Sequence, residues 1–550
     1  MKRLIKSKAG ASAFVRRFHL FDFLLIVVLL SVFWITINAP FDYLAETDKD
    51  KDYLVARHIV QYKEFPLSGP WNSISGAFTH SPVSYYFLAP FVAIKDDIVF
   101  LRFVNILLQL ITIVIIYLLA KKAFGSGTAF IASLLFGLSS HILLLSRYPI
   151  VPVLAHPFIN LSYLLLLFAY VKKSYPLLLG SIVALLFAWA IHSTPILVMP
   201  LFLAVIFLIL RKQGGSIVHY IGALAVFAGS FLLFYSSVLL DLYKTGFDTS
   251  SHFLTSLVVS SPYEFSQNFL SNLQSLIGFF FSSNLLMTTR SLGGLLFFVL
   301  LLGVPLYFFY FQKDASKKFY ALLALLGVLQ LLVMLSLLKA PVYGYMFIPV
   351  LGLFIIFIAE ILNTILSKYH ILTVFKIILV ILLIKVFSMN FFFLETQPQE
   401  NRLDPIITSI KTELYEIKTR EDYNDFSFFQ VRLYRELQPR STSEKRRWFP
   451  FADAVFWTPL EKDLNTKLTT TIGKNYQFYV YRYFGSMPIG SDDYIFLICQ
   501  NQFSRISDIE NECIDTFLME HRTHSIGRQL YSQDSFSVYV MKKIPHSDTL

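Results

Sequence analysis

The chain has 550 residues, of which 55% are hydrophobic, 17% aromatic and only 15% charged. A mean hydropathy of +0.59 excludes an ordinary water-soluble enzyme and indicates a protein that crosses a membrane several times. The net charge of +11 does not indicate a nucleic-acid-binding protein, because the Lys and Arg residues are scattered over many connections.

Long apolar stretches follow one another along the chain. A stretch of about 18 or more apolar residues can cross the hydrocarbon core as a helix, and we count about eleven of them. The fifth and sixth are short and flank Ser193, Thr194 and Pro195, so they could also be one hairpin or one broken helix. The predicted spans are 20–39, 98–120, 126–146, 150–171, 175–192, 194–210, 217–240, 292–312, 318–338, 342–366 and 371–394.

Positive charge falls in every second connection between these spans. Since short cytoplasmic loops are enriched in Lys and Arg, this alternation predicts a plasma-membrane protein with a cytoplasmic N-terminus. The loops at 40–97, 241–291 and 339–341 would then be extracytoplasmic, and so would the C-terminal part. The basic residues concerned are Lys2, Arg3, Lys6, Lys8, Arg16, Arg17, Lys121, Lys122, Lys172, Lys173, Arg211, Lys212, Lys313, Lys317, Lys318 and Lys368.

The composition changes near residue 395, where charged and polar residues become common. We therefore predict a transmembrane domain at 1–394, with a catalytic first outer loop at 40–97, and a soluble extracytoplasmic domain at 395–550. The predicted architecture is a polytopic α-helical bundle followed by a domain of the α/β or α+β type.

Alternating and amphipathic patterns predict the elements of the C-terminal domain. Residues 403–420 are typical of an amphipathic helix, and 476–484, 494–499 and 535–542 of strands. Both cysteines of the chain, Cys499 and Cys513, also fall in this domain. An extracytoplasmic pair can oxidise, but the sequence gives no Cα separation, so the pairing stays open.

Carboxylates crowd the first outer loop, immediately after the first span. Asp48 and Asp52 are four residues apart and would share one face of a helix that starts near Asp48. A carboxylate at a lipid boundary is costly unless it faces water, pairs with a cation or does chemistry. Asp48 is thus a candidate general base and Asp52 a second catalytic candidate. The simpler interpretation is that these aspartates only cap the start of a helix and face water.

Several motifs, taken in order, resemble GT-C glycosyltransferases. They are Asp-x3-Asp at Asp48–Asp52 before an Ala-Arg pair, Pro-Leu-x-Gly-Pro from Pro66, and Gly-x-x-x-His-x-Pro-x-x-Tyr-Tyr from Gly76. Together they are similar to bacterial and archaeal relatives of the dolichyl-phosphate-mannose protein mannosyltransferases, over about residues 20–390. The Asp-Lys-Asp-Lys-Asp run departs from the Asp-Glu common in relatives, which leaves the choice among the three aspartates open. Later motifs are Leu101–Asn105, Ser146–Pro149, Trp189–Ser193 and Pro341–Tyr345.

The resemblance implies an enzyme that moves a hexosyl or pentosyl unit from a polyprenyl-phosphate donor on the extracytoplasmic face. The acceptor would be a lipid-linked glycan, a cell-wall polymer or a protein. With an aspartate as general base, a single displacement would invert the anomeric configuration. The leaving phosphate needs positive charge, for which Arg has suitable geometry. The substrate-binding candidates are Arg57, His80, Tyr85, Arg102, Arg147, His192 and Tyr345.

Two other functions remain alternatives, namely a lipid-glycan flippase or transporter and a membrane anchor for an outer binding domain. A transporter would favour paired helix breaks in corresponding halves, and only the break at 193–195 is evident. The sequence has no His, Cys or Asp spacing typical of a metal site. A divalent ion on Asp48, Asp50 and Asp52 would require a suitably folded loop, and we predict no other cofactor.

Overall fold

The structure is a computed structural model, and its internal contacts divide the chain into two compact units. The first comprises Met1–Ala39, Leu67–Phe91 and Val99–Thr396, and the second comprises Pro40–Pro66, Val92–Ile98 and Gln397–Leu550. The residues that the structure describes are 20–38, 47–63, 65–67, 69, 80–139, 142–143, 146, 151–244, 266–269, 271–272, 303, 313–337, 344–368, 400–422, 429–437, 447–451, 493–500, 510–520, 524–533 and 536–544.

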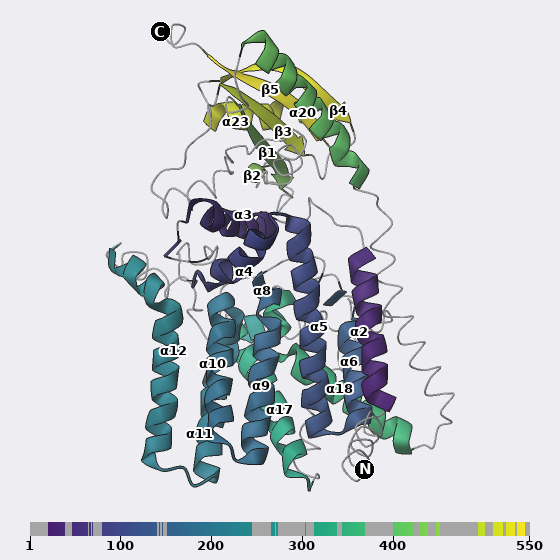
Figure 1. The fold of residues 1–550 in the computed structure, drawn as a ribbon, viewed down its shortest axis with the longest axis vertical. Helices are drawn as coiled ribbons and strands as arrows, with labels where there is room; N and C mark the ends of the chain where they lie inside the picture. The colour runs from purple at the N-terminus through teal and green to yellow at the C-terminus, as the bar shows by residue number, and fades with distance from the viewer. Residues whose placement is uncertain are drawn as a thin grey trace, which may run out of the picture. The chain divides into compact units, whose positions relative to one another are not determined.

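Helices make up the first unit where it is described (Figure 1). Within the described residues, five segments are long and apolar enough to cross a membrane: Phe21–Asn38, Phe100–Ala123, Thr194–Lys212, Ile217–Asp241 and Ala315–Ser336. The helices are α2 (Leu20–Asn38), α4 (Val83–Ile94), α5 (Ile98–Ala123), α6 (Ser126–Gly137), α8 (Val151–Leu154), α9 (His156–Lys172), α10 (Tyr175–Ile191), η1 (Thr194–Val198), α11 (Met199–Lys212), α12 (Ile217–Lys244), α17 (Ala315–Ser336), η3 (Gly344–Phe347) and α18 (Ile348–Lys368).

Most of the described helices lie on predicted spans. The spans predicted at 292–312 and 371–394 lie outside the described residues, apart from residue 303, so the total of about eleven stays a prediction. The fourth predicted span is interrupted at Ala155, between α8 and α9, and Pro157 lies in the first turn of α9. The apolar helix α4 lies within the predicted outer loop, because its 12 residues are too few for the span criterion.

A buried polar pair satisfies the backbone at the α8–α9 interruption. Gln109 of α5 donates from Nε2 to the carbonyl oxygen of Val153 (3.2 Å), and its Oε1 lies 3.2 Å from His156 Nδ1. Gln109 and His156 are both fully buried. An unpaired carbonyl in an apolar interior costs roughly 2–7 kcal/mol, so these side chains make the interruption tolerable inside the bundle.

The second unit contains a mixed five-stranded sheet with the order β2-β1-β3-β5-β4. Strands β1 and β3 are parallel, and the other neighbours are antiparallel. The predicted helix at 403–420 is confirmed as α20, and the strands predicted at 494–499 and 535–542 are confirmed as β3 and β5; residues 476–484 lie outside the described residues. The elements are α3 (Thr47–Tyr62), α20 (Glu400–Arg420), β1 (Phe429–Leu437), β2 (Arg447–Phe451), β3 (Tyr494–Gln500), α23 (Glu510–Glu520), β4 (His524–Gln533) and β5 (Phe536–Lys543).

Charged side chains attach α20 to this sheet. Arg528 of β4 donates to Glu413 and to Glu416 Oε2 (2.8 Å), both on α20. Just beyond the helix, Glu421 accepts hydrogen bonds from Tyr494 and from Lys542 Nζ (3.0 Å). Burial raises the pKa of Glu421, but these hydrogen bonds and the neighbouring positive charges outweigh it, so the pKa is lowered. Because the pKa is lowered in the folded state, ionised Glu421 stabilises the sheet at pH values above the usual pKa of a free glutamate. This contribution is lost as the pH falls.

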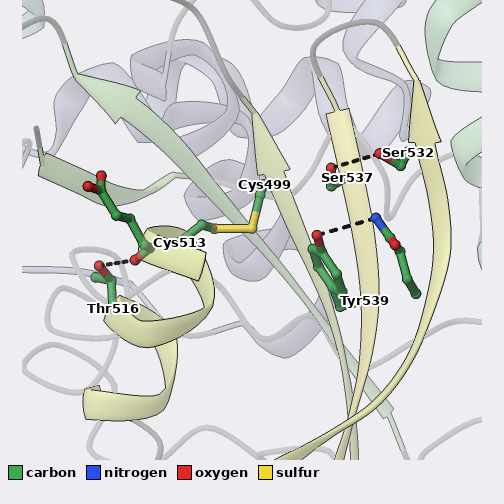
Figure 2. Close-up of a disulfide and its surroundings, with 8 residues drawn as sticks. Cys499, Cys513, Thr516, Ser532, Ser537 and Tyr539 are labelled. Atoms are coloured by element: carbon green, nitrogen blue, oxygen red, sulfur yellow. Dashed lines mark hydrogen bonds between the residues drawn. A yellow bond between two sulfur atoms is a disulfide. The ribbon is translucent and has the colours of Figure 1, made fainter. Parts of the chain in front are cut away.

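The two cysteines form a disulfide that joins β3 to α23 (Figure 2). Their Cα atoms are 6.3 Å apart, which resolves the pairing that the sequence left open. The bond lies in an apolar cluster with Ile495, Leu497 and Phe517. Alternate residues of β3 thus face α23, as the period of a strand requires.

We expect the disulfide to stabilise the second unit. Because it closes a loop with a sequence separation of 14, the variant Cys499→Ala/Cys513→Ala should lower the unfolding free energy of this unit by about 3 kcal/mol. Limited proteolysis of the full-length protein across a urea series, with identification of the fragments, measures the effect. A reductant should reproduce the loss in the native protein and leave the variant unchanged. Identical protection of the native and variant proteins would contradict the expectation.

Candidate functional site

The candidate site begins at His80, three residues before the start of α4. The backbone N–H of Gly69 donates to the carbonyl oxygen of His80 (2.7 Å). A Cβ at residue 69 would lie 2.1 Å from the carbonyl oxygen of Ser81 and 3.0 Å from that of His80. Only glycine permits this close approach of two backbone segments, so Gly69 sets the position of His80.

The structure places His80 beside His192, which comes from a distant part of the sequence. Their rings stack with centroids 6.4 Å apart and planes inclined by 12°. His192 is the extended residue at the end of α10, before the 3₁₀ turn η1 that contains Pro195. Both rings are partly exposed. The two predicted binding histidines therefore form one feature, which we call the His80–His192 pair.

Hydrogen bonds fix the tautomer of His192. The backbone N–H of Thr194 donates to His192 Nδ1 (3.3 Å), and the Thr194 hydroxyl lies 3.0 Å from the same nitrogen. A backbone N–H can donate only to an unprotonated ring nitrogen, so the proton of the neutral imidazole is on Nε2. An Nε2–H group is a hydrogen-bond donor to a phosphate or hydroxyl oxygen, and a protonated ring would add positive charge.

Ser81 connects this site to α4 and α12. Its hydroxyl donates to the carbonyl oxygen of Phe234 in α12 (2.6 Å) and accepts from the backbone N–H of Val83 in the first turn of α4 (3.3 Å). On α12, Tyr235 donates to the carbonyl oxygen of Trp189 (3.1 Å). Our sequence analysis did not single out Ser81 or Tyr235, although the His-Ser-Pro segment is a typical helix-start signal.

The catalytic candidates lie on α3, in the second unit. The predicted helix is confirmed, and positions 48 and 52 are one turn apart on it, whereas position 50 lies about half a turn away. Asp52 is 2% exposed, and Arg57 and His58 are each 5% exposed. Only the backbone of Asp48 and Asp50 falls within the described residues.

Asp96 accepts hydrogen bonds from two side chains of α3. Tyr53 donates to Asp96 Oδ1 (2.7 Å), and Arg57 Nε donates to Asp96 Oδ2 (3.0 Å). Arg57 is thus an ion-pair partner of a carboxylate in the same unit. In the described parts of the chain, no group of three His, Cys, Asp or Glu side chains is arranged to hold a metal ion.

The comparisons with known proteins concern the family and the fold. The family model described as dolichyl-phosphate-mannose-protein mannosyltransferase matches residues 79–240, a segment that includes His80, Ser81, His192 and Phe234. The fold is similar to that of ArnT from Cupriavidus metallidurans bound to undecaprenyl phosphate, with a TM-score of 0.57 and 12% identity over 94% of this chain and 97% of that one. In fold the chain thus resembles the GT-C membrane glycosyltransferases, and its residues 79–240 match the mannosyltransferase family.

Two further solved structures are among the matches. The apo state of the same ArnT gives a TM-score of 0.55 at 12% identity, over 96% of this chain and 98% of that one. The oligosaccharyltransferase of Archaeoglobus fulgidus in its apo form gives a TM-score of 0.48 at 15% identity. The match covers 89% of this chain and 70% of that one. A search of curated protein sequences gives no match. The GT-C fold and the apolar helices make this chain a multi-pass membrane protein.

The remaining binding candidates lie in other parts of the structure. Arg102 is 5% exposed and donates from Nη2 to the carbonyl oxygens of Thr36 and Ile37 (3.4 Å to Ile37), at the end of α2. This contact caps helix carbonyls that have no partner within the helix. Tyr85 is buried in α4. Arg147 lies outside the described residues, and only the backbone of Tyr345, in η3, is described.

The variant Gly69→Ala should displace His80 and reduce the activity or donor binding of the site by about 10–100-fold, since misplacing a binding group by about 1 Å can cost that much. The added methyl group meets backbone atoms, which cannot rotate away. Gly229→Ala is the matched control, because a Cβ there has no neighbour within 4 Å. Transfer assays on both variants, with thermal unfolding to verify folding, test this. Equal activity of the two folded variants would show that Gly69 does not position the site.

Proposed function

We propose that the chain transfers a monosaccharide from a polyprenyl-phosphate donor to an extracytoplasmic acceptor. The observation that carries the proposal is the His80–His192 pair at a helix interruption. The pair lies within the segment that matches the mannosyltransferase family. The similar fold of ArnT, solved with undecaprenyl phosphate, supports a polyprenyl-phosphate donor.

The His80–His192 pair is proposed to contact the donor. A sugar linked to a lipid phosphate carries negative charge on the phosphate oxygens, and this charge grows as the glycosidic bond breaks. The Nε2–H of His192 can donate a hydrogen bond there, and a charge-assisted bond is stronger than a neutral one. Arg147, Tyr85 and Tyr345 remain proposed donor contacts. Arg57 and Arg102 also remain proposed donor contacts. Each has a structural role as well, because Arg57 pairs with Asp96 and Arg102 caps the end of α2.

Asp48 is the proposed general base, with Asp52 one turn away on α3. The base takes the proton of the acceptor nucleophile, which attacks the anomeric carbon as the bond to the phosphate oxygen breaks. The products are the glycosylated acceptor and the free polyprenyl phosphate, and a single displacement inverts the anomeric configuration. The burial of Asp52 supports a role for its face of α3, because a buried carboxylate is costly without a specific purpose.

The reaction is proposed to take place outside the cytoplasm, with the N-terminus inside and the sheet of the second unit outside. The alternation of basic connections supports this orientation. The Cys499–Cys513 disulfide supports it independently, because disulfides persist mainly in oxidising compartments. The proposed acceptor is a lipid-linked glycan, a cell-wall polymer or a protein.

The variant Asp48→Asn should lower turnover by about 10²–10⁴-fold while donor binding persists, because it removes the base and keeps the side-chain size. The measurement is the release of polyprenyl phosphate from a labelled polyprenyl-phosphate sugar by the reconstituted protein, with an envelope extract as the acceptor source. Asp97→Asn, outside α3, is the control and should retain activity.

Parallel assays of Asp50→Asn and Asp52→Asn locate the base among the three aspartates. A loss confined to one of these two neighbours moves the role from Asp48 to that residue. Full activity in all three variants rules out an aspartate base on α3 and contradicts the proposed mechanism.

A further inference from the structure

Four exposed cations lie at the ends of α9 and α11. Lys172 and Lys173 end α9, and Arg211 and Lys212 end α11. None of the four has a carboxylate within ion-pair distance in the described part of the chain. By contrast, Lys121 at the end of α5 pairs with Asp22 (2.6 Å). The four residues, which we call the basic patch, thus retain their positive charge at the surface.

Hydrogen bonds hold the two helix ends together. Gln213, just after α11, donates from Nε2 to the carbonyl oxygen of Ala169 in the last turn of α9 (3.0 Å). Lys212 Nζ donates to the hydroxyl oxygen of Tyr170 (2.5 Å). These bonds bring the cations of two separate connections close together.

Aromatic rings lie beneath the basic patch. Tyr170 stacks on Phe319 of α17 with ring centroids 4.3 Å apart and planes inclined by 11°. Lys212 Nζ is 4.7 Å from the centroid of Tyr170, and Lys172 Nζ is 5.0 Å from that of Phe168. Such lysines lay their apolar stems along rings and hold the ammonium group at the membrane boundary. Tyrosine at the end of an apolar helix is also typical of the headgroup layer.

Neighbouring acids do not neutralise the basic patch. Asp314 accepts hydrogen bonds from the backbone N–H groups of Ser316 and Lys317 and so caps α17. Glu360 pairs with Lys317 (3.2 Å) and accepts from Thr128 (2.6 Å). One cation at the end of each helix would suffice to balance the helix dipole. The patch has twice that number, at the ends of two apolar helices.

We propose that the basic patch binds the headgroups of anionic phospholipids. Membrane lipids are the anions present at high concentration beside the ends of apolar helices, and each Lys or Arg near an anionic leaflet adds to the attraction. The ammonium groups of Lys172 and Lys212 and the guanidinium of Arg211 contact the lipid phosphate, while the rings beneath pack against the upper acyl chain. The partner is thus a phospholipid with net negative charge.

Spin-labelled lipids measure this preference in the reconstituted full-length protein. The association constant of labelled phosphatidylglycerol should exceed that of labelled phosphatidylcholine by several-fold and should fall with added salt. The variant Lys172→Gln/Lys212→Gln should reduce the preference by about fivefold or more, from the loss of two interfacial charges. The conservative variant Lys172→Arg/Lys212→Arg should retain it.

The control variant Lys95→Gln/Lys122→Gln removes two cations outside the patch and should keep the preference. An equal loss in the control would show a general charge effect and overturn the proposal. The same association constant for both lipids in the native protein would overturn it as well. Selective binding of soluble glycerol phosphate, without selectivity among lipids, would show a site for free anions instead.

Discussion

The interruption between α10 and α11 is the constraint on which the candidate site depends. Pro195 has no N–H to donate, and it disfavours helical geometry at Thr194, so one continuous helix cannot form there. The freed backbone groups need partners at membrane depth. The N–H of Thr194 finds one in His192 Nδ1, and the N–H of Ile196 donates to the carbonyl oxygen of Ser193 (3.0 Å). The same bond that makes the interruption tolerable also orients the His192 ring.

The position of His80, the other ring of the pair, depends on the close packing of the backbone around it. Gly69 allows the two backbone segments to approach, and Ser81 attaches the start of α4 to the carbonyl of Phe234 in α12. His80 lies between these two fixed points and stacks on His192. Each contact is local, yet together they join the loop, α10 and α12 into one arrangement. The proposed transfer reaction needs such rigidity, because small displacements of binding groups are costly.

The sequence predicted helices well wherever the signal was long and periodic. The apolar spans that fall in the described residues, α20 and α3 were evident, because their patterns repeat over several turns. It predicted His80 and His192 as binding residues but could not show that they meet, because stacking depends on the packing of distant segments. It missed α4 as a separate helix, since the segment is short and contains Pro90. The partners of Arg102 are backbone carbonyls at the end of α2, which no residue pattern indicates.

The most direct measurement is the affinity of the reconstituted protein for polyprenyl phosphate in a double-mutant cycle of His80→Ala and His192→Ala. Each single variant should weaken binding by about 10-fold or more, as expected for a lost hydrogen bond to a charged group. Because the rings are in contact, the double variant should lose less than the product of the two single effects. Native affinity in the folded double variant would contradict the assignment of this site to the donor.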